Sequence, residues 1–338
     1  MKAPRFLIVR FSSIGDIILS APLINAIREH YGPDSRIDFV TLKRFSSAAD
    51  LLPSLNTIHL VENTTSEVVP ALKDLEFDYL IDLHGNVRSR SLSKALNILT
   101  FTINKQTLQR FALVLGVRKK PIQHFVDRSL NLLKPFGIPT PSHPWGSLKS
   151  KAMSSDSYSS LPNEYITIAP GAAHIGKVIP DSTLLEICNA FSSQKIHIAI
   201  VGGQDSIPIV TKLISSNPNN AITSFCGNTS LPETAYIIEN SNLVIGGDTG
   251  AMHLASALHT PLISIWGCTR PSLGLSPWRP HRATIILLPH DRDSRPCSRH
   301  GSKCRFKRRG QDLCINHVSP SRIIEAASQI LNSEQLHK

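Results

Sequence analysis

The sequence predicts an α/β protein made of two parallel-sheet halves, and three observations support this prediction. Short apolar runs typical of buried strands alternate with segments whose apolar residues recur at helical spacing. A stretch rich in proline and serine, residues 139–163, interrupts this alternation, which then resumes. Each half also carries a glycine turn directly after an apolar run, at residues 12–16 and 247–253. Alternation of this kind indicates parallel strands covered by helices.

In the first half, strands are expected at residues 6–9, 37–41, 57–61 and 79–82. A helical stripe follows the first strand, and Pro22 within it predicts either a kink or a later helix start, because proline lacks the N–H that a helix interior needs. The stripe consists of Ile14, Ile17, Ile18, Ala21, Ile24 and Ile27. Further helices are expected within residues 66–75, 88–97, 105–115 and 124–136.

The second half repeats this rhythm. The expected strands are residues 165–169, 196–201, 221–225, 242–245 and 262–266, and the expected helices are residues 181–193, 204–216, 231–240 and 249–258. A last amphipathic run, residues 320–331, is expected to close the fold. We therefore predict a first domain at 1–150, a linker at 151–164, a second domain at 165–318 and a closing helical segment at 319–338.

Composition places the chain among ordinary globular proteins. The 338 residues suffice for two domains, and 41% are hydrophobic and 18% charged. No apolar run approaches the roughly 20 residues of a membrane helix. The N-terminal apolar run is broken by Arg10, whereas a signal peptide has a longer uninterrupted apolar core. A cytoplasmic protein is therefore expected. The net charge of +11 favours anionic partners, namely sugar nucleotides, phosphorylated lipids, a membrane face or nucleic acid.

Both glycine turns are suited to binding phosphate. Residues 247–253 read Gly-Asp-Thr-Gly-Ala-Met-His, between an apolar run and a helical stripe, and residues 12–16 follow the first expected strand. A strand–turn–helix junction directs unpaired backbone N–H groups and the positive end of a helix at one point. Ligands of parallel sheets bind beyond the carboxyl ends of the strands, where both turns lie. Two such turns in two similar halves suggest a cleft with a reactive group on each wall.

Four motifs in order resemble those of the lipopolysaccharide heptosyltransferases, glycosyltransferase family 9. The first is residues 8–18, Ile-Val-Arg-Phe-Ser-Ser-Ile-Gly-Asp-Ile-Ile. The others are Pro170-Gly171-Ala172 with Lys177 and Pro180, Gly246-Gly247-Asp248-Thr249-Gly250 with His253, and residues 261–267. The resemblance implies the GT-B fold, with two Rossmann-like domains facing across a cleft. It also implies inverting transfer of heptose from ADP-heptose to the inner core of lipopolysaccharide, without a cofactor or an obligatory metal.

Asp16 is the candidate catalytic base. Forming a glycosidic bond requires removal of the proton from the attacking acceptor hydroxyl, and a positioned carboxylate supplies this. The resemblance places the family's proposed base at Asp16. The alternative is a helix cap, a role that aspartate favours.

Lys177 is the candidate for stabilising the diphosphate leaving group, on which negative charge builds as the bond breaks. The alternative is a solvated surface lysine. The resemblance implies that the donor is bound by Gly15, Gly171, Asp248, Thr249, Gly250 and His253. Asp248 would repel phosphate, so we assign it to the donor sugar hydroxyls or to shaping the turn. Some relatives carry a glutamate after the strand at 196–201, where this chain offers Gln204 and Asp205.

Arg88 and Arg90, which follow the strand at 79–82, are the candidate acceptor-binding residues. Guanidinium groups pair with carboxylates and phosphates, and the inner core carries both. A solvated basic loop is the alternative. The first domain is accordingly expected to hold the acceptor, and the second is expected to hold ADP-heptose.

A basic, cysteine-containing segment near the C-terminus has several interpretations. Residues 295–309 hold seven lysines or arginines and no acid. A zinc site would use Cys297, Cys304, Cys314 and either His300 or His317, although the spacing lacks a C-x-x-C pair. The alternative is a loop with free thiols, and Cys188, Cys226 and Cys268 are interpreted as reduced core thiols.

The same basic charge would also hold the protein at the anionic cytoplasmic face of the inner membrane as a peripheral protein. A nucleic-acid partner is not expected, since no aromatic ladder or nucleic-acid fold motif accompanies the charge. Three other functions stay open. They are transfer from another nucleotide sugar, epimerisation of a sugar nucleotide, and a non-catalytic relative that binds glycolipid or nucleic acid.

Overall fold

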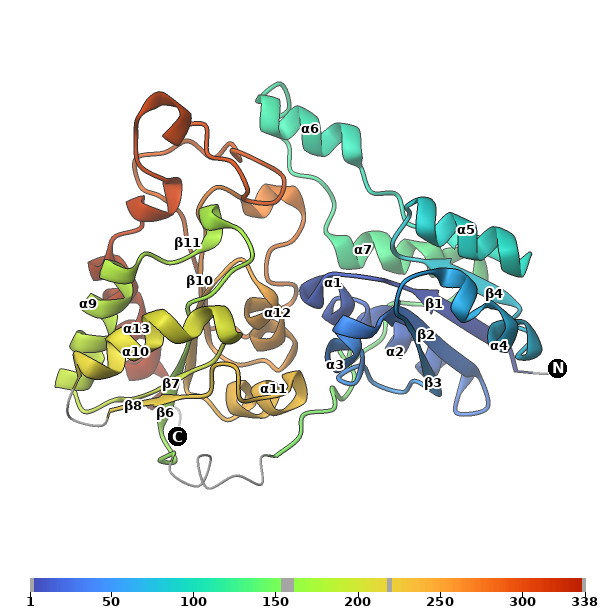
Figure 1. Cartoon of the computed structure of the whole chain (residues 1–338), viewed down its shortest axis with the longest axis horizontal. Helices are drawn as coiled ribbons and strands as arrows, with labels where there is room; N and C mark the ends of the chain where they lie inside the picture. Colours follow the sequence, from blue (N-terminus) through green and yellow to red (C-terminus); the bar gives the residue numbers. More distant parts are fainter. Residues whose placement is uncertain (1–2, 153–160, 218–220, 336–338) are drawn as a thin grey trace. The chain divides into compact units, whose positions relative to one another are not determined.

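The computed structural model describes residues 3–152, 161–217 and 221–335 (Figure 1). The described residues divide into two compact units, which draw on Met1–Gln106 with Gln123–Lys149 and on Thr107–Ile122 with Ser150–Lys338. The segment Thr107–Ile122 thus packs with the second unit. Residues 153–160 of the expected linker lie outside the described residues, so the linker and the domain limits stay predictions.

The first unit is built on a parallel sheet of the order β3-β2-β1-β4-β5. Its strands are β1 (Arg5–Val9), β2 (Arg36–Leu42), β3 (Thr57–Val61), β4 (Tyr79–Asp82) and β5 (Leu99–Thr102). Its helices are α1 (Ile14–Ile18), α2 (Ala21–Tyr31), α3 (Ser46–Ala49), α4 (Val69–Asp74), α5 (Val87–Leu96) and α7 (Phe125–Leu130), with 3-10 turns η1 (Lys43–Phe45), η2 (Thr65–Glu67) and η3 (Asn131–Phe136).

The apolar residues that recur at helical spacing after β1 belong to two helices. α1 ends at Ile18 and α2 begins at Ala21, with Pro22 in its first turn. Proline is tolerated there, because the N–H groups of a first turn have no partner within the helix. The later start that Pro22 allowed is therefore confirmed for α2, and α1 is a separate short helix that carries Asp16.

The second unit is built on a parallel sheet of the order β11-β10-β9-β6-β7-β8. Its strands are β6 (Tyr165–Ala169), β7 (His197–Ile200), β8 (Ile222–Ser224), β9 (Leu243–Gly247), β10 (Leu262–Ile265) and β11 (Thr284–Leu287). Its helices are α6 (Thr107–Leu115), α9 (Asp181–Ser193), α10 (Ile207–Ser215), α11 (Leu231–Glu239), α12 (Gly250–Ala257) and α13 (Pro320–Gln335). Short 3-10 turns are η4 (Ile175–Lys177), η5 (Gln204–Ser206), η6 (Pro271–Leu273), η7 (Lys307–Arg309) and η8 (Cys314–His317).

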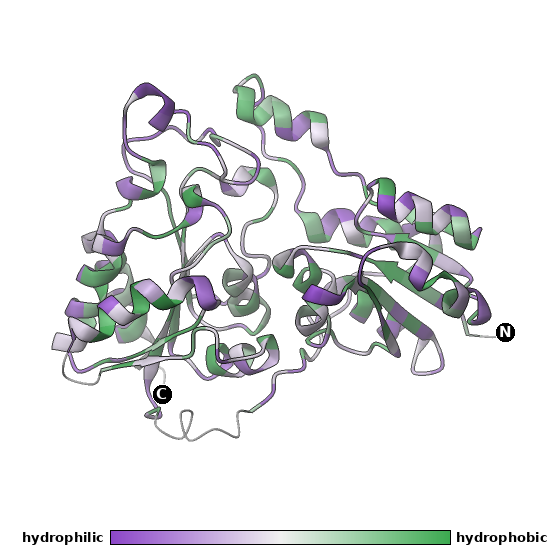
Figure 2. Ribbon diagram, viewed as in Figure 1, coloured by the Kyte–Doolittle hydropathy of each residue, from purple (hydrophilic) through white to green (hydrophobic). Residues whose placement is uncertain are grey.

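The apolar runs of the sequence form the cores of both units. β1 and β6 lie inside their sheets, and nearly all of their residues are buried. Figure 2 shows the strands mostly in hydrophobic colours, whereas the helices carry both colours. The sequence did not predict β5 and β11, which lie at sheet edges and are only partly buried. The edge strands β3 and β8 were predicted, so an edge position does not by itself explain the two misses. β11 reads Thr-Ile-Ile-Leu, an apolar run that sequence reasoning overlooked.

The strand order puts a topological switch point in each sheet. In the first unit the chain leaves β1 toward β2 and β3 and returns on the other side of β1 with β4. In the second unit it leaves β6 toward β7 and β8 and returns with β9. Such switch points mark the ligand-binding edge of open α/β sheets, beyond the carboxyl ends of the two strands. The α/β prediction is confirmed, and no helix among the described residues is long and apolar enough to cross a membrane.

Candidate functional site

Asp16 lies beyond the carboxyl end of β1, in the first turn of α1. Its carboxylate accepts hydrogen bonds from the backbone N–H of Ser13 at 3.3 Å and from the Ser13 hydroxyl at 3.1 Å. It also pairs with the guanidinium of Arg10. Asp16 keeps 21% of its side chain exposed, and Arg10 keeps 12%. Asp16 is therefore both a helix-cap residue and a carboxylate held by a cation at the switch point, with access to solvent.

His84 lies beyond the end of the neighbouring strand, β4, and joins this group. Its ring packs edge-on against Phe11 at 5.3 Å between centroids. Burial lowers the pKa of His84 to about 4, and the positive charges of Arg10, Lys105 and Arg88 act in the same direction. The imidazole is therefore neutral near pH 7. We call Arg10, Asp16, His84, Arg88 and Lys105 the Asp16 cluster.

The two arginines proposed to bind the acceptor lie differently on α5. The Arg88 guanidinium lies 5.7 Å from the centroid of the Phe11 ring, which brings it to the Asp16 cluster. Arg90 is exposed two residues further on, and residues at that spacing do not share a helix face. Asp82 shapes the turn before α5, because its buried carboxylate accepts hydrogen bonds from His84 N–H at 2.8 Å and Ser89 Oγ at 2.7 Å.

In the second unit, Lys177 and Asp248 form a buried ion pair. Lys177 follows β6 and Asp248 follows β9, the two strands of the switch point. Lys177 Nζ lies 2.7 Å from Asp248 Oδ2, with side-chain exposures of 16% and 5%. The Thr269 hydroxyl donates to the same carboxylate at 2.8 Å. Lys177 is therefore not a solvated surface lysine, and Asp248 is engaged in holding Lys177 and the turn.

The turn after β9 leaves polar groups available at the start of α12. The Thr249 hydroxyl is buried and has no hydrogen-bond partner among the described residues. Gly250 begins α12, and His253 lies one helical turn further, 5% exposed. Gly247 has no room for a side chain, since a Cβ there would lie 2.7 Å from the backbone oxygen of Lys177. These residues, with Lys177, Asp248 and Thr269, form what we call the Lys177 cluster.

A pocket of about 250 Å³ lies beside Gly171, at the ends of β6 and β7. Asp205 and Ser206 line it together with apolar side chains such as Ile179 and Ile209. The Ser206 hydroxyl is buried without a hydrogen-bond partner in the described part of the chain. The absence of a side chain at Gly171 leaves room for the Ser206 hydroxyl, which a Cβ there would displace. The pocket thus combines a carboxylate and an unpaired hydroxyl with an apolar wall.

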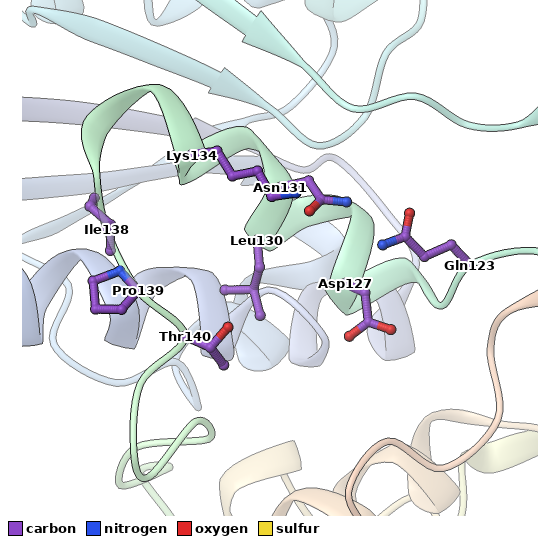
Figure 3. A pocket seen from close by; sticks show the side chains of 8 residues that line it. All are labelled: Gln123, Asp127, Leu130, Asn131, Lys134, Ile138, Pro139 and Thr140. Atoms are coloured by element: carbon purple, nitrogen blue, oxygen red, sulfur yellow. The ribbon is translucent and has the colours of Figure 1, made fainter.

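A second hollow, of about 310 Å³, lies in the first unit along α7 and η3. Figure 3 shows Leu130 between this helix and the loop that carries Pro139 and Thr140. Its lining combines aliphatic and amide side chains with Asp127 and Lys134, and it contains none of the predicted site residues. The Asp16 and Lys177 clusters, by contrast, lie at the switch points of the two sheets and form the candidate site.

The late cysteines come together, but with a different fourth partner from the one predicted. The thiols of Cys268, Cys297, Cys304 and Cys314 all lie within 4.8 Å of one another. Cys268, which the sequence placed among isolated core thiols, thus takes the place expected for a histidine. Neither histidine belongs to this group. The ring of His300 lies 6.5 Å from that of His174, and His317 lies 2.8 Å from the Asp291 carboxylate.

Sequence reasoning missed five polar residues at these sites, namely Arg10, His84, Lys105, Ser206 and Thr269. Arg10 and His84 lie inside segments that the sequence did single out, at the ends of expected strands. That position was a usable signal. Ser206 and Thr269 carry no such local signal, since their partners come from distant parts of the chain.

Comparisons with known proteins agree with this architecture. The model of a family described as glycosyltransferase family 9 (heptosyltransferase) matches residues 66–306. Lipopolysaccharide heptosyltransferase 3 of Escherichia coli is 23% identical over 295 residues, which cover 80% of this chain and 85% of that protein.

Two solved structures resemble the whole chain. A glycosyltransferase family 9 protein from Veillonella parvula has a TM-score of 0.79 at 17% identity and covers 98% of both chains. The E. coli ADP-heptose lipopolysaccharide heptosyltransferase II has a TM-score of 0.72 at 17% identity and covers 98% of this chain and 99% of that one. The predicted GT-B class, with two Rossmann-like domains, is confirmed.

Proposed function

Because this chain belongs to glycosyltransferase family 9, the heptosyltransferase family, we propose that it transfers heptose from ADP-heptose to the inner core of lipopolysaccharide, with inversion at the anomeric carbon. The observation that carries the proposal is the position of the reactive groups. Asp16 follows β1 at one switch point, and Lys177 and Asp248 follow β6 and β9 at the other. Glycosyl transfer needs a base for the acceptor and a cation for the diphosphate. Asp16 would supply the base at the ligand-binding edge of the first unit, and Lys177 would supply the cation at that of the second.

In the proposed reaction, Asp16 accepts the proton of the acceptor hydroxyl as the hydroxyl oxygen attacks the anomeric carbon of the donor sugar. The bond from that carbon to the diphosphate oxygen breaks, and ADP leaves with the bonding electron pair. A single displacement of this kind inverts the anomeric centre. Arg10 and Ser13 hold the Asp16 carboxylate in one orientation, and such a base contributes roughly 10²–10⁴-fold to the rate.

The Lys177 cluster would stabilise the departing ADP. The Lys177 ammonium and the N–H groups at the start of α12 offer positive charge where negative charge develops. The Thr249 hydroxyl is buried and unpartnered among the described residues, so it can donate to a phosphate oxygen without losing another bond. Asp248 holds the Lys177 ammonium in place. The proposed contact of Asp248 is therefore with Lys177, in place of the donor sugar hydroxyls.

The pocket beside Gly171 would take the nucleoside. Its Asp205 carboxylate can accept hydrogen bonds from ribose hydroxyls. The apolar side chains, including Ile179 and Ile209, offer a surface for the base. This assignment gives the buried Ser206 hydroxyl a ligand to bind.

The Asp16 cluster would bind an anionic acceptor. Arg10, Arg88 and Lys105 surround a neutral His84, so positive charge exceeds the single carboxylate of Asp16. Guanidinium groups bind the phosphates and carboxylates that the lipopolysaccharide inner core carries. Arg90, which is exposed on the same helix, is proposed as an outer contact for the same acceptor.

We also propose that the protein associates peripherally with the cytoplasmic face of the inner membrane. α6 packs Leu113 against Ile122 and Leu273, but its other side presents apolar side chains to solvent. Leu108 is 82% exposed and Phe111 is 52% exposed. Exposed lysines follow at positions 119 and 120. Apolar residues beside basic ones are typical of a surface that lies on anionic lipid.

The test compares heptose transfer from ADP-heptose to purified inner-core acceptors by wild type and by Asp16→Asn. The amide keeps the shape and the cap of α1 but cannot take the proton, so a loss of at least roughly 10²-fold is expected. Glu67→Gln is the matched control, because Glu67 caps η2 through Thr64 in the same way. Unchanged transfer by Asp16→Asn would refute the proposed base, and ADP binding without heptose transfer would indicate another donor sugar.

A further inference from the structure

Four cysteines from separate loops of the second unit meet at one point. Cys268 follows β10, Cys297 and Cys304 lie in the loop after β11, and Cys314 begins η8. Their sulfur atoms all lie within 4.8 Å of one another. The Cys297 and Cys314 sulfurs are 3.5 Å apart, and those of Cys304 and Cys314 are 3.8 Å apart.

These separations decide between a metal site and disulfides. A tetrahedral ion with metal–sulfur bonds of about 2.3 Å has sulfur atoms about 3.8 Å apart along each edge. A disulfide requires about 2.05 Å and joins sulfurs in pairs. Cys314 is close to two other sulfurs at once, and the four thiols form one group. We propose that Cys268, Cys297, Cys304 and Cys314 together bind one tetrahedral metal ion, zinc or iron, as thiolates.

The surroundings of the four thiols fit a closed, structural site. Cys268, Cys304 and Cys314 are buried, Cys297 is partly buried, and Phe306 and Leu313 pack against the group. Four protein ligands leave no open coordination position, so the ion would hold loops together and would not act on substrate. Each thiol releases its proton to solvent when the ion binds.

The basic segment 295–309 offers positive charge beside the four thiols. Four thiolates around a divalent ion carry a net charge of −2, which needs compensation in a buried place. The backbone N–H of Arg305 hydrogen-bonds to the Cys297 sulfur, and the Arg305 charge acts on the same atom. Seven basic residues flank Cys297 and Cys304 in the sequence, within 295–309. Arg305 would balance part of the charge of the metal–thiolate group.

The metal site would also fix the backbone that carries Lys177. The N–H of Cys268 donates to the oxygen of Gly176 at 2.8 Å, and the N–H of Gly176 donates to the oxygen of Gly301 at 3.0 Å. Gly301 lies against the Lys177 side chain, because a Cβ there would be 2.8 Å from Lys177 Cγ. Loss of the ion is expected to loosen both contacts. An effect of this loosening on catalysis through Lys177 would rest on the proposed glycosyl transfer, whereas the metal site itself does not.

The experiment measures the metal content of the full-length protein, expressed with zinc and iron supplied and freed of loosely bound ions. We expect one equivalent of zinc or iron per chain, and elemental analysis tells which. The metal content per chain of Cys304→Ser is expected to be at least roughly tenfold lower than that of wild type. Cys188→Ala is the matched control, since Cys188 is buried in α9 and belongs to a different apolar cluster. It is expected to keep the full equivalent.

A second measurement keeps the proposal falsifiable if Cys304→Ser does not fold. Wild-type protein is titrated with a mercurial reagent, and metal release is expected to follow modification of four thiols. A metal content below roughly a tenth of an equivalent in wild type would overturn the proposal. So would full retention of metal by a folded Cys304→Ser. Neither measurement uses activity, so the metal site and the proposed transferase reaction can fail independently.

Discussion

Removing Lys177 should reveal how strongly it is coupled to Asp248. In Lys177→Met the 5%-exposed Asp248 carboxylate would keep the Thr269 hydroxyl and lose the cation that pairs with it among the described residues. Breaking a buried ion pair from one side costs about 3–5 kcal/mol, because an uncompensated charge stays buried. Lys177 retains 16% exposure, which allows some hydration of the site, so we expect the lower end, about 3 kcal/mol. For a domain of this size that corresponds to about 6–12 °C in Tm.

The assay is thermal unfolding of a double-mutant cycle. Lys177→Met and Asp248→Asn are measured singly and together, and the double variant should recover most of the stability that Lys177→Met loses, since no unpaired charge remains. Lys212→Met is the matched control. Its pair with Asp181 is 3.4 Å long and its side chains are 71% and 62% exposed, so a change below about 0.5 kcal/mol is expected.

The coupling energy decides the outcome. A loss in Lys177→Met as small as that in Lys212→Met would refute the argument that Lys177 and Asp248 form a buried, mutually dependent pair. Additive effects of the two substitutions would refute it equally. Heptose transfer is a separate readout. We expect it to be lost in Lys177→Met and in the double variant, because the proposed stabilisation of the diphosphate requires the ammonium itself. In Asp248→Asn we expect a smaller loss, because the ammonium is present but no longer paired with the carboxylate that holds it.

Three further predictions follow from the structure. The folded-state pKa of His84, about 4, lies below its unfolded value of about 6.5, so the unfolded chain binds the proton first as pH falls. Wild type should therefore lose about 1–2 kcal/mol more than His84→Gln between pH 6.5 and pH 4, after discounting for the partial exposure of the ring, and parallel curves of Tm against pH would contradict this. Thr249→Val should weaken ADP binding roughly 10- to 150-fold, the equivalent of one hydrogen bond to a charged group, with little change in Tm. Calorimetric titration of ADP tests this against Thr167→Val, which alters another buried, unpartnered hydroxyl, and equal affinities would count against the assignment. Replacing Phe111 and Leu115 by glutamate should reduce co-sedimentation with anionic vesicles at least roughly tenfold, whereas Ile214→Glu, at an apolar position 41% exposed on α10, should have no effect, and equal losses would argue against α6 as the membrane contact.

The sequence predicted most of the strands and helices because their signals are local. Buried strands such as β1 and β6 read as short apolar runs, and helices such as α9 read as stripes at helical spacing. The edge strands β5 and β11 were missed, whereas the equally exposed edge strand β3 was predicted, so partial burial alone does not explain the misses. Pro22 marked a break in the stripe correctly but could not show that it separates two helices.

By itself, the sequence determined that Asp16 and Lys177 follow apolar strands, that glycines open the turns beside them, and that cysteines and basic residues gather late in the chain. Only the tertiary structure decided which of these groups meet. Asp248 pairs with Lys177 because β9 returns beside β6, and Cys268 joins Cys297, Cys304 and Cys314 because the loops after β10 and β11 fold together. Strand order and loop packing bring together residues far apart in the chain, and no local pattern of spacing or hydrophobicity specifies those contacts.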